Sequence, residues 1–291
     1  MRQTLENIIK DTIIIKATLD STKRSSISSV DDHCLESLSD ENLKKIIYEW
    51  IIEYSYNEFE IIEKDINILH RNALSTKLKY DHNATQETQE KYWFYGEILL
   101  DWILKVLFWT NCLISRGYFY NPLENSETKW FDCYHLISND DQLYLYYGET
   151  KFHQNAKSWI TDVLNKIENS LSNQYLEKNL LALVNHKEKI IDWTIWSIIN
   201  RRQEEWLNLI QTIQDNHIIL VYPILIIGNY IKQDYNENIE EQVKHIESLL
   251  PKTISLSIQY EIFFIFLPVY NTQDIKQTII EWISSNKALE L

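Results

Sequence analysis

Blocks of apolar residues with two different spacings run along the chain and predict both strands and helices. Residues 12–19 are mostly β-branched and apolar, which is typical of a strand. Residues 21–40 are rich in Ser and Asp and predict a loop. Between 43 and 54 the apolar residues recur every three or four positions, which predicts an amphipathic helix with Ser39 or Asp40 as its N-cap.

The middle of the chain continues this alternation. A polar segment at 80–89 predicts a linker, and the spacing of apolar residues predicts a helix over 88–108. Two β-prone runs, 129–137 and 143–152, flank a turn rich in Asn and Asp, which predicts a hairpin.

The remainder of the chain adds helices and two apolar strands. Helical spacings cover 155–171, 187–213, 239–250 and 271–285. The runs at 217–230 and 254–269 are nearly continuous in apolar residues, as expected for strands that are covered on both faces. This order of elements predicts a fold of the α/β class.

The composition is that of a folded protein, with 45% hydrophobic and 24% charged residues among 291. The net charge of −14 argues against a protein that coats DNA by itself, although it leaves room for a nuclease with a small basic groove. The three cysteines lack the spacing of a zinc site or a disulfide framework. No apolar run approaches the ~20 residues of a membrane span, so we expect a soluble, cytoplasmic protein without membrane contact.

Charged residues on the predicted hairpin can converge on one point. Glu149 and Lys151 are two residues apart on the second strand, so their side chains project from the same face. Asp132 lies in the preceding strand, which the turn brings alongside. Glu97, on the helix before the hairpin, can complete the group if that helix packs across the strands.

Carboxylates and a lysine in this arrangement suit phosphodiester hydrolysis. Carboxylate oxygens hold Mg²⁺ while leaving water in its shell, and the metal polarises phosphate and lowers the pKa of a bound water. The lysine adds a fixed positive charge near the attacking water or the developing charge on phosphate. Taken alone, Glu-x-Lys is also common as an exposed ion pair, so the hypothesis depends on Asp132 and Glu97.

Four blocks of sequence carry a resemblance to a known family. They read FYGEILL at 94–100, WFDCYH at 130–135, GETKF at 148–152 and LVYPIL at 220–225. In this order they resemble the PD-(D/E)xK nuclease superfamily, and in particular the HamA family of Hachiman anti-phage defence systems. The resemblance covers about residues 40–270. Trp130 and Tyr95 are departures from the family pattern, but every charged motif residue is present.

The resemblance implies an architecture and partners. The architecture is an α/β core of the PD-(D/E)xK restriction-endonuclease-like type, a mixed sheet flanked by helices, over 81–291. A strand and a helix-rich N-terminal part over 1–80 would pack on that core. The resemblance further implies a metal-dependent deoxyribonuclease that acts on DNA and is held in complex with, and regulated by, a HamB-like superfamily-2 helicase.

The resemblance also implies roles for individual residues. Glu97, Asp132 and Glu149 would bind Mg²⁺, for which Mn²⁺ can substitute, and the Thr150 carbonyl would add a ligand. Asp132, Glu149 and Lys151 would carry catalysis, with Lys151 positioning or activating the attacking water.

Other interpretations stay open. A non-catalytic regulatory subunit of a defence complex can retain the same fold, and a ribonuclease cannot be separated because no residue reads or excludes a 2′-hydroxyl. His135 and His153 can tune the site, although a plain polar neighbour is the more frequent role. Most aromatic rings, Trp102 and Trp109 among them, fall at core spacings rather than on a base-stacking surface.

Overall fold

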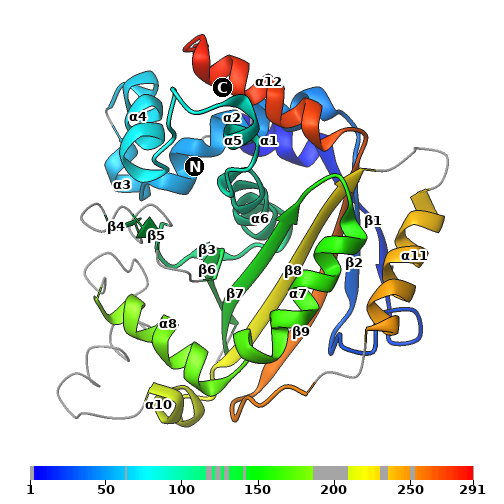
Figure 1. The fold of residues 1–291 in the computed structure, drawn as a ribbon. Helices are drawn as coiled ribbons and strands as arrows, with labels where there is room; N and C mark the ends of the chain where they lie inside the picture. Colours follow the sequence, from blue (N-terminus) through cyan, green and yellow to red (C-terminus); the bar gives the residue numbers. More distant parts are fainter. Residues whose placement is uncertain are drawn as a thin grey trace.

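The computed structural model describes residues 3–62, 64–115, 120–121, 126–127, 131–139, 142–185, 209–229, 235–249 and 253–290. At its centre is a seven-stranded sheet with the strand order β1-β2-β9-β8-β7-β6-β3 (Figure 1). The four central strands β2, β9, β8 and β7 are parallel, and β1, β6 and β3 pair antiparallel with their neighbours. The strands are β1 (Ile13–Leu19), β2 (Asp32–Ser37), β3 (Asn111–Cys112), β6 (Cys133–Asn139), β7 (Gln142–Phe152), β8 (Ile219–Asn229) and β9 (Tyr260–Val269), and a separate pair is formed by β4 (Tyr120–Asn121) and β5 (Ser126–Glu127).

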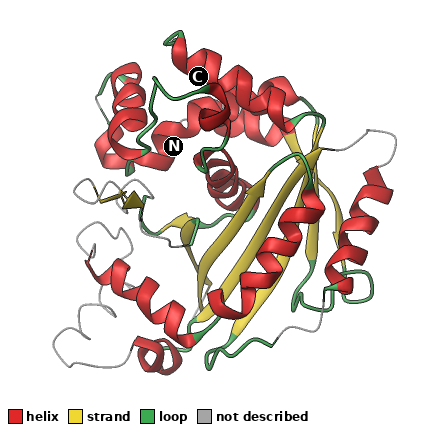
Figure 2. Cartoon of the chain, in the orientation of Figure 1, coloured by secondary structure: helices red, strands yellow, loops and turns green. Residues whose placement is uncertain are grey.

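Helices cover both faces of the sheet (Figure 2). One face carries α1 (Gln3–Thr12), α2 (Asp40–Ser55), α6 (Phe94–Leu107) and α12 (Thr272–Ser284), and the opposite face carries α7 (Ala156–Ser170), α8 (Asn173–Asn185), α10 (Leu209–Asp215) and α11 (Tyr235–Ser248). Shorter helical segments are α3 (Glu58–Ile61), α4 (Ile66–Asn72), the π-helix η1 (Ala73–Lys77) and α5 (Gln86–Glu90). The predicted α/β class, with a mixed sheet flanked by helices, is therefore confirmed.

Two hydrophobic cores lie on the two faces of the sheet, and β8 contributes to both. Leu225 and Ile227 pack with α2, α6 and α12, whereas Ile224 and Ile226 pack with α7, α8 and α11. Successive side chains of a strand point to opposite faces, so a strand covered on both sides must be apolar throughout. The prediction made from the continuous apolar runs is confirmed.

Several helix boundaries follow from capping residues that the sequence displays. The side chain of Ser39 accepts a hydrogen bond from the backbone N–H of Asn42 and begins α2. Asn271 likewise accepts from Gln273 and Asp274 at the start of α12. Both helices lie where the pattern predicts them.

The loop expected over 21–40 is wrong in part, because it contains strand β2. This strand carries few β-branched or aromatic residues, so its sequence gives little indication of a strand. It forms because β1 and β9 pair with it on either side, and because the Asp32 carboxylate accepts hydrogen bonds from the Phe264 N–H at 2.8 Å and the Ser28 hydroxyl at 2.7 Å. The N-terminal strands thus belong to the same sheet as the predicted hairpin.

Other boundaries also differ from the expectations. The helix expected over 88–108 is two helices, because α5 ends at Glu90 and α6 begins at Phe94. The first hairpin strand begins at Cys133 rather than at 129, so Asp132 precedes the strand instead of lying within it, although its N–H still donates to the Gly148 carbonyl at 2.9 Å.

The helix expected over 187–213 lies mostly outside the described residues, as do Arg201 and Arg202; α10 covers its end, and α8 was not predicted. The core position expected for Trp109 is wrong: its side chain is 70% exposed, because α6 ends at Leu107 and Trp109, with φ at 56°, turns the chain away from the helix. No helix in the described ranges has the length and apolar character that crossing a membrane requires.

Candidate active site

Two glycines allow α6 and β6 to approach β7 closely. A Cβ at Gly96 would lie 3.0 Å from the Thr150 Oγ1 and 3.3 Å from the Phe152 Cβ. A Cβ at Gly148 would lie 2.8 Å from the Cys133 Sγ. All three distances are shorter than ordinary van der Waals contact, so a side chain at either position would force its neighbours to shift. In both motifs the glycine is followed directly by a glutamate. The close approach of the elements therefore places Glu97 and Glu149 next to the points of contact.

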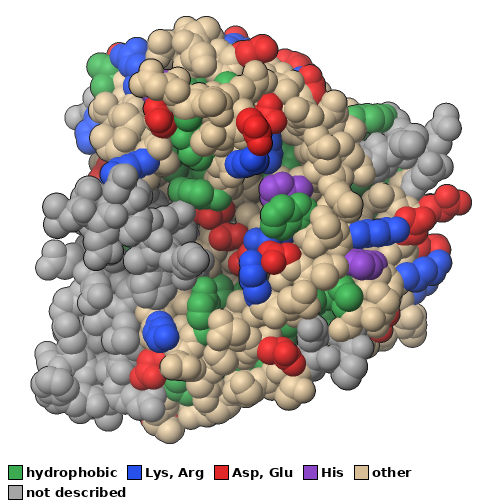
Figure 3. All heavy atoms as spheres, in the orientation of Figure 1, with side chains coloured by type: hydrophobic (Ala, Val, Ile, Leu, Met, Phe, Trp, Pro, Cys, Tyr) green, Lys and Arg blue, Asp and Glu red, His purple; other side chains and the backbone are tan. Residues whose placement is uncertain are grey.

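A pocket of about 150 Å³ lies at this junction. Glu97 of α6, Asp132 before β6, and Thr150 and Lys151 of β7 line one part of it. Figure 3 shows acidic side chains in a hollow near the centre of this face, with basic side chains and a histidine beside them. Residues that are more than 50 positions apart in sequence therefore face one cavity, as the hairpin hypothesis expects.

Backbone and side-chain contacts orient the charged groups. The Asp132 Oδ2 accepts a hydrogen bond from the backbone N–H of Thr150 at 2.7 Å. The Lys151 ammonium donates to the Glu149 carboxylate, and the two side chains are only 16% and 22% exposed. On the other side of the pocket, the Tyr54 hydroxyl of α2 donates to Glu97, which is buried. Each predicted site residue is thus held by a specific neighbour.

The charges at this site perturb one another. Burial, reinforced by the negative charge of Asp132, raises the pKa of Glu149 to about 7, and the charge of Lys151 only partly opposes this. Burial disfavours the charged form of Lys151, but the charges of Glu149 and Asp132 outweigh it and raise the pKa of Lys151. Lys151 therefore stays protonated at neutral pH, whereas Glu149 readily exchanges a proton.

The predicted site residues lie in one region, but their carboxylate groups do not form a compact cluster. Glu97, Asp132, Thr150 and Lys151 share the pocket, and Glu149 lies beside it, paired with Lys151. Among the described residues, one cluster of three potential metal ligands has its ligand atoms within 4.8 Å of one another. It contains none of the predicted site residues.

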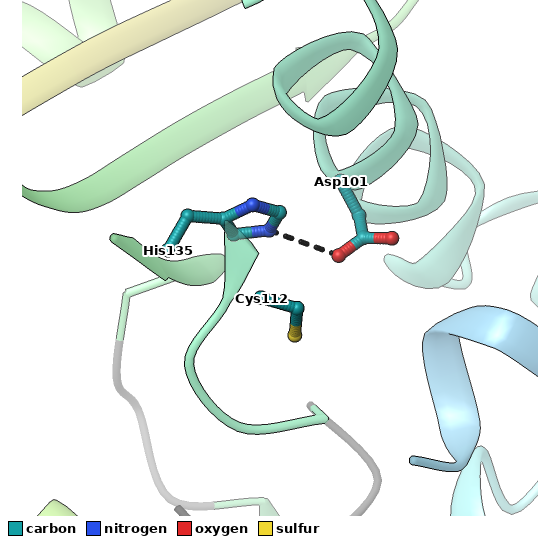
Figure 4. Close-up of side chains that lie close together, drawn as sticks. All are labelled: Asp101, Cys112 and His135. Carbon is teal, nitrogen blue, oxygen red and sulfur yellow. Dashed lines mark hydrogen bonds and ion pairs between the residues drawn. The ribbon is translucent and has the colours of Figure 1, made fainter. Parts of the chain in front are cut away.

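That cluster consists of Asp101, Cys112 and His135 (Figure 4). The His135 Nε2 lies 2.9 Å from the Asp101 Oδ1, and its Nδ1 lies 2.7 Å from the Thr110 hydroxyl. The Asp101 carboxylate also accepts from the Trp50 Nε1 at 2.6 Å and from the Lys105 ammonium at 3.0 Å. Because both carboxylate oxygens already have donors and a lysine supplies the positive charge, the cluster is a hydrogen-bonded network rather than a cation site.

This network was missed in the sequence, although one signal was present. Asp101 follows Glu97 by one helical turn and so lies on the same face of α6. The network ties that helix to β6 through His135, close to the residues of the pocket. His135 is therefore a buried partner of Asp101, and it does not line the pocket.

Several other residues that line the pocket were also missed. Lys91 and Trp93 come from the junction of α5 and α6, His153 and Trp159 follow β7, and Lys276 comes from α12 near the end of the chain. The place of His153 on the motif strand makes it a candidate neighbour of the site, but nothing in the sequence connects Lys276 with residues 97–151. Only the tertiary structure brings it there, where its ammonium donates to the Phe152 carbonyl at the end of β7.

Comparisons with known proteins agree with the motif resemblance. No match was found among curated proteins or among solved structures. A family model described as HamA matches residues 6–283, which is nearly the whole chain and includes all four motif blocks. The chain belongs to the HamA family.

Proposed function

We propose that this chain is a metal-dependent DNA nuclease that acts within a Hachiman defence complex. Membership of the HamA family suggests a component of that defence system. The observation that carries the nuclease proposal is the convergence of Glu97, Asp132 and Lys151, from three separate elements, on one pocket. A pocket that combines carboxylates with a lysine is suited to phosphodiester chemistry.

The donor set fits a hard divalent cation. Asp132 and Glu149 would hold Mg²⁺ or Mn²⁺ through carboxylate oxygens, and Glu97 and the Thr150 carbonyl would add oxygen ligands. The raised pKa of Glu149 supports this fit, because it reflects a buried carboxyl beside the like charge of Asp132, and a cation there would relieve the repulsion. When bound, such a metal polarises phosphate and lowers the pKa of a coordinated water.

The chain's own residues would divide the remaining work. Lys151 is held protonated by its acidic neighbours, so it would act as a fixed positive charge toward a scissile phosphate rather than as a base. The Thr150 N–H fixes one oxygen of Asp132, and Tyr54 fixes Glu97. These contacts would orient the acidic groups before substrate binds, which reduces the reorganisation that the reaction requires.

The partner in this proposal is a HamB-like superfamily-2 helicase. The net charge of −14 gives the chain little electrostatic attraction for DNA by itself. A partner that grips DNA would therefore supply most of the affinity and would control access to the pocket.

One observation favours a second candidate, a regulatory subunit without catalysis. Lys151 is ion-paired with Glu149, and the three acidic residues do not lie within 4.8 Å of one another as a group in the described structure. A subunit that retained the fold for assembly alone would tolerate such a pairing.

A cleavage assay separates the two. Wild type, Lys151→Ala and the control Lys244→Ala, whose side chain on α11 is 75% exposed, are incubated with plasmid and linear DNA, alone and with a HamB-like helicase. We expect cleavage with Mg²⁺, none with a chelator, and a loss of at least 100-fold for Lys151→Ala only, in line with the loss of one electrostatic group. If no combination cuts DNA, the regulatory role replaces the nuclease.

A further inference from the structure

The proposed metal chemistry uses only some of the residues that line the pocket. The same pocket is also lined by Lys91, Trp93, His153, Trp159 and Lys276, which combine flat rings with positive charge. None of these side chains is needed to hold a metal. Their chemistry matches the two parts of a nucleotide, because bases stack on aromatic rings and phosphates pair with lysines.

The rings of His153 and Trp159 are stacked face to face. Their centroids are 3.8 Å apart and their planes differ by 15°. Both side chains are half-buried and line the pocket, and Trp159 belongs to neither hydrophobic core. Burial, together with the positive charges of Lys276 and Lys151, lowers the pKa of His153 to about 4, so its ring is neutral at physiological pH. The pair is therefore an uncharged aromatic surface at the pocket.

Lys276 is a buried cation without an acidic partner. Its side chain is 6% exposed and its ammonium donates to the Phe152 carbonyl at 2.8 Å. Its ammonium forms no ion pair among the described residues and lies 4.9 Å from the centroid of the Phe152 ring, and burial lowers the pKa of Lys276 to about 8, although the charge of Glu90 opposes this. Burying a charge without a counter-charge is costly, so this position favours an anionic ligand.

The size of the pocket limits what can enter. Cavities of about 150 Å³ accept a single benzene-sized ring. A base within a duplex is covered on both faces by its neighbours and cannot stack on a protein ring unless it leaves the helix. The pocket thus has room for no more than one unpaired base.

We propose that these aromatic and basic residues bind one nucleotide of single-stranded DNA next to the scissile phosphate, with its base against Trp159 and a flanking phosphate on Lys276. The inference rests on the proposed nuclease function, whose substrate class it specifies. The carboxylates and Lys151 face the bond to be cut, and the aromatic pair fixes the register of the strand beside it.

The test is a binding measurement under conditions that prevent cleavage. Fluorescence anisotropy of a labelled oligothymidylate and of a hairpin duplex of equal length is followed with the full-length chain in chelator at low salt. The variants are Trp159→Ala, Trp159→Phe and Lys276→Met. Trp109→Ala is the control, because this exposed ring follows the C-terminal end of α6, whereas the pocket lies at the N-terminal end of that helix. Thermal unfolding confirms that each variant is folded.

We expect wild type to bind the single strand more tightly than the duplex. Trp159→Ala should weaken single-strand binding about 5-fold to 150-fold, the effect of one stacked base, whereas Trp159→Phe and Trp109→Ala retain most of the affinity. Lys276→Met should weaken binding and reduce the slope of log affinity against log salt by about 0.7, the share of one phosphate contact.

Three results overturn the inference: tighter binding of the duplex, equal binding by wild type and Trp159→Ala, or no measurable binding by wild type at low salt. A parallel plasmid assay with Mg²⁺ and the helicase keeps the two proposals apart. Cleavage that is unaffected by Trp159→Ala and Lys276→Met leaves the nuclease standing and removes the nucleotide pocket. Single-strand binding that depends on Trp159, without cleavage in any combination, removes the nuclease and keeps the binding site.

Discussion

The buried network around Asp101 offers the sharpest test of how this fold is held together. Its carboxylate accepts hydrogen bonds from Trp50 of α2, Lys105 of its own helix and His135 of β6, so it joins three elements. The perturbation is Asp101→Asn, which keeps the shape of the side chain and removes its charge. Although burial opposes ionisation, Lys105 and His135 hold the pKa of Asp101 well below its ordinary range, so the charge removed is present at neutral pH.

The magnitude follows from the burial of the pair. The Asp101 and Lys105 side chains are 5% and 16% exposed, and breaking a buried pair from one side costs about 3–5 kcal/mol because the other charge is left uncompensated. The residual exposure of Lys105 and the nearby negative charge of Glu53 place the expected loss near the lower end, at about 3 kcal/mol. Lys105→Met should cost less, because Trp50 and His135 still donate to the carboxylate. The double variant should be more stable than the sum of the two losses predicts.

Urea unfolding followed by tryptophan fluorescence measures these losses as a shift in midpoint at constant m-value. The matched control is Ile103→Val on the same helix, which should cost about 0.5–1.5 kcal/mol through lost packing alone. A loss below about 1 kcal/mol for Asp101→Asn, or strict additivity in the double variant, would refute the argument that a compensated charge stabilises this junction.

Three further predictions concern the pocket. Gly96→Ala places a Cβ 3.0 Å from a β7 side chain, so it should destabilise the fold by about 1 kcal/mol once the gain in helix propensity is subtracted. It should also raise the Mg²⁺ concentration needed for half-maximal cleavage. A metal titration of Gly96→Ala, with Ile103→Val as the control, checks this. Folding raises the pKa of Glu149 from 4.5 to about 7, so its stabilising contribution is complete below pH 4.5 and is lost as pH rises through 7. Calorimetry without metal should show this fall in stability with pH for wild type, and Glu149→Gln should lack it. Tyr54→Phe leaves the buried Glu97 without this donor and should cost about 1–3 kcal/mol in urea unfolding, whereas an unchanged midpoint would show that the hydrogen bond is dispensable.

Local sequence patterns determined most of the elements. The apolar spacing and the caps at Ser39 and Asn271 predicted α2 and α12, and the continuous apolar runs predicted β8 and β9. The alternation of side chains along a strand predicted that Glu149 and Lys151 share a face, and they form an ion pair. These features depend on neighbouring residues, and for that reason they can be read from a single sequence.

Features that depend on distant partners were not predicted. β2 forms because strands from both ends of the chain pair with it, and its own residues favour a strand only weakly. Trp109 has core spacing with Trp102, but α6 ends between them and leaves Trp109 exposed. In each instance tertiary pairing or the end of an element outweighed the local pattern.

The candidate site shows the same division. The sequence by itself identified the acidic residues and Lys151 as candidates for the site, because motif order and strand alternation are local properties. Only the tertiary structure showed that Gly96 lets α6 meet β7, that Asp101 holds His135, and that Lys276 reaches the pocket from α12. These contacts join positions up to 124 residues apart in the chain, and packing energy, rather than any pattern along the sequence, selects them.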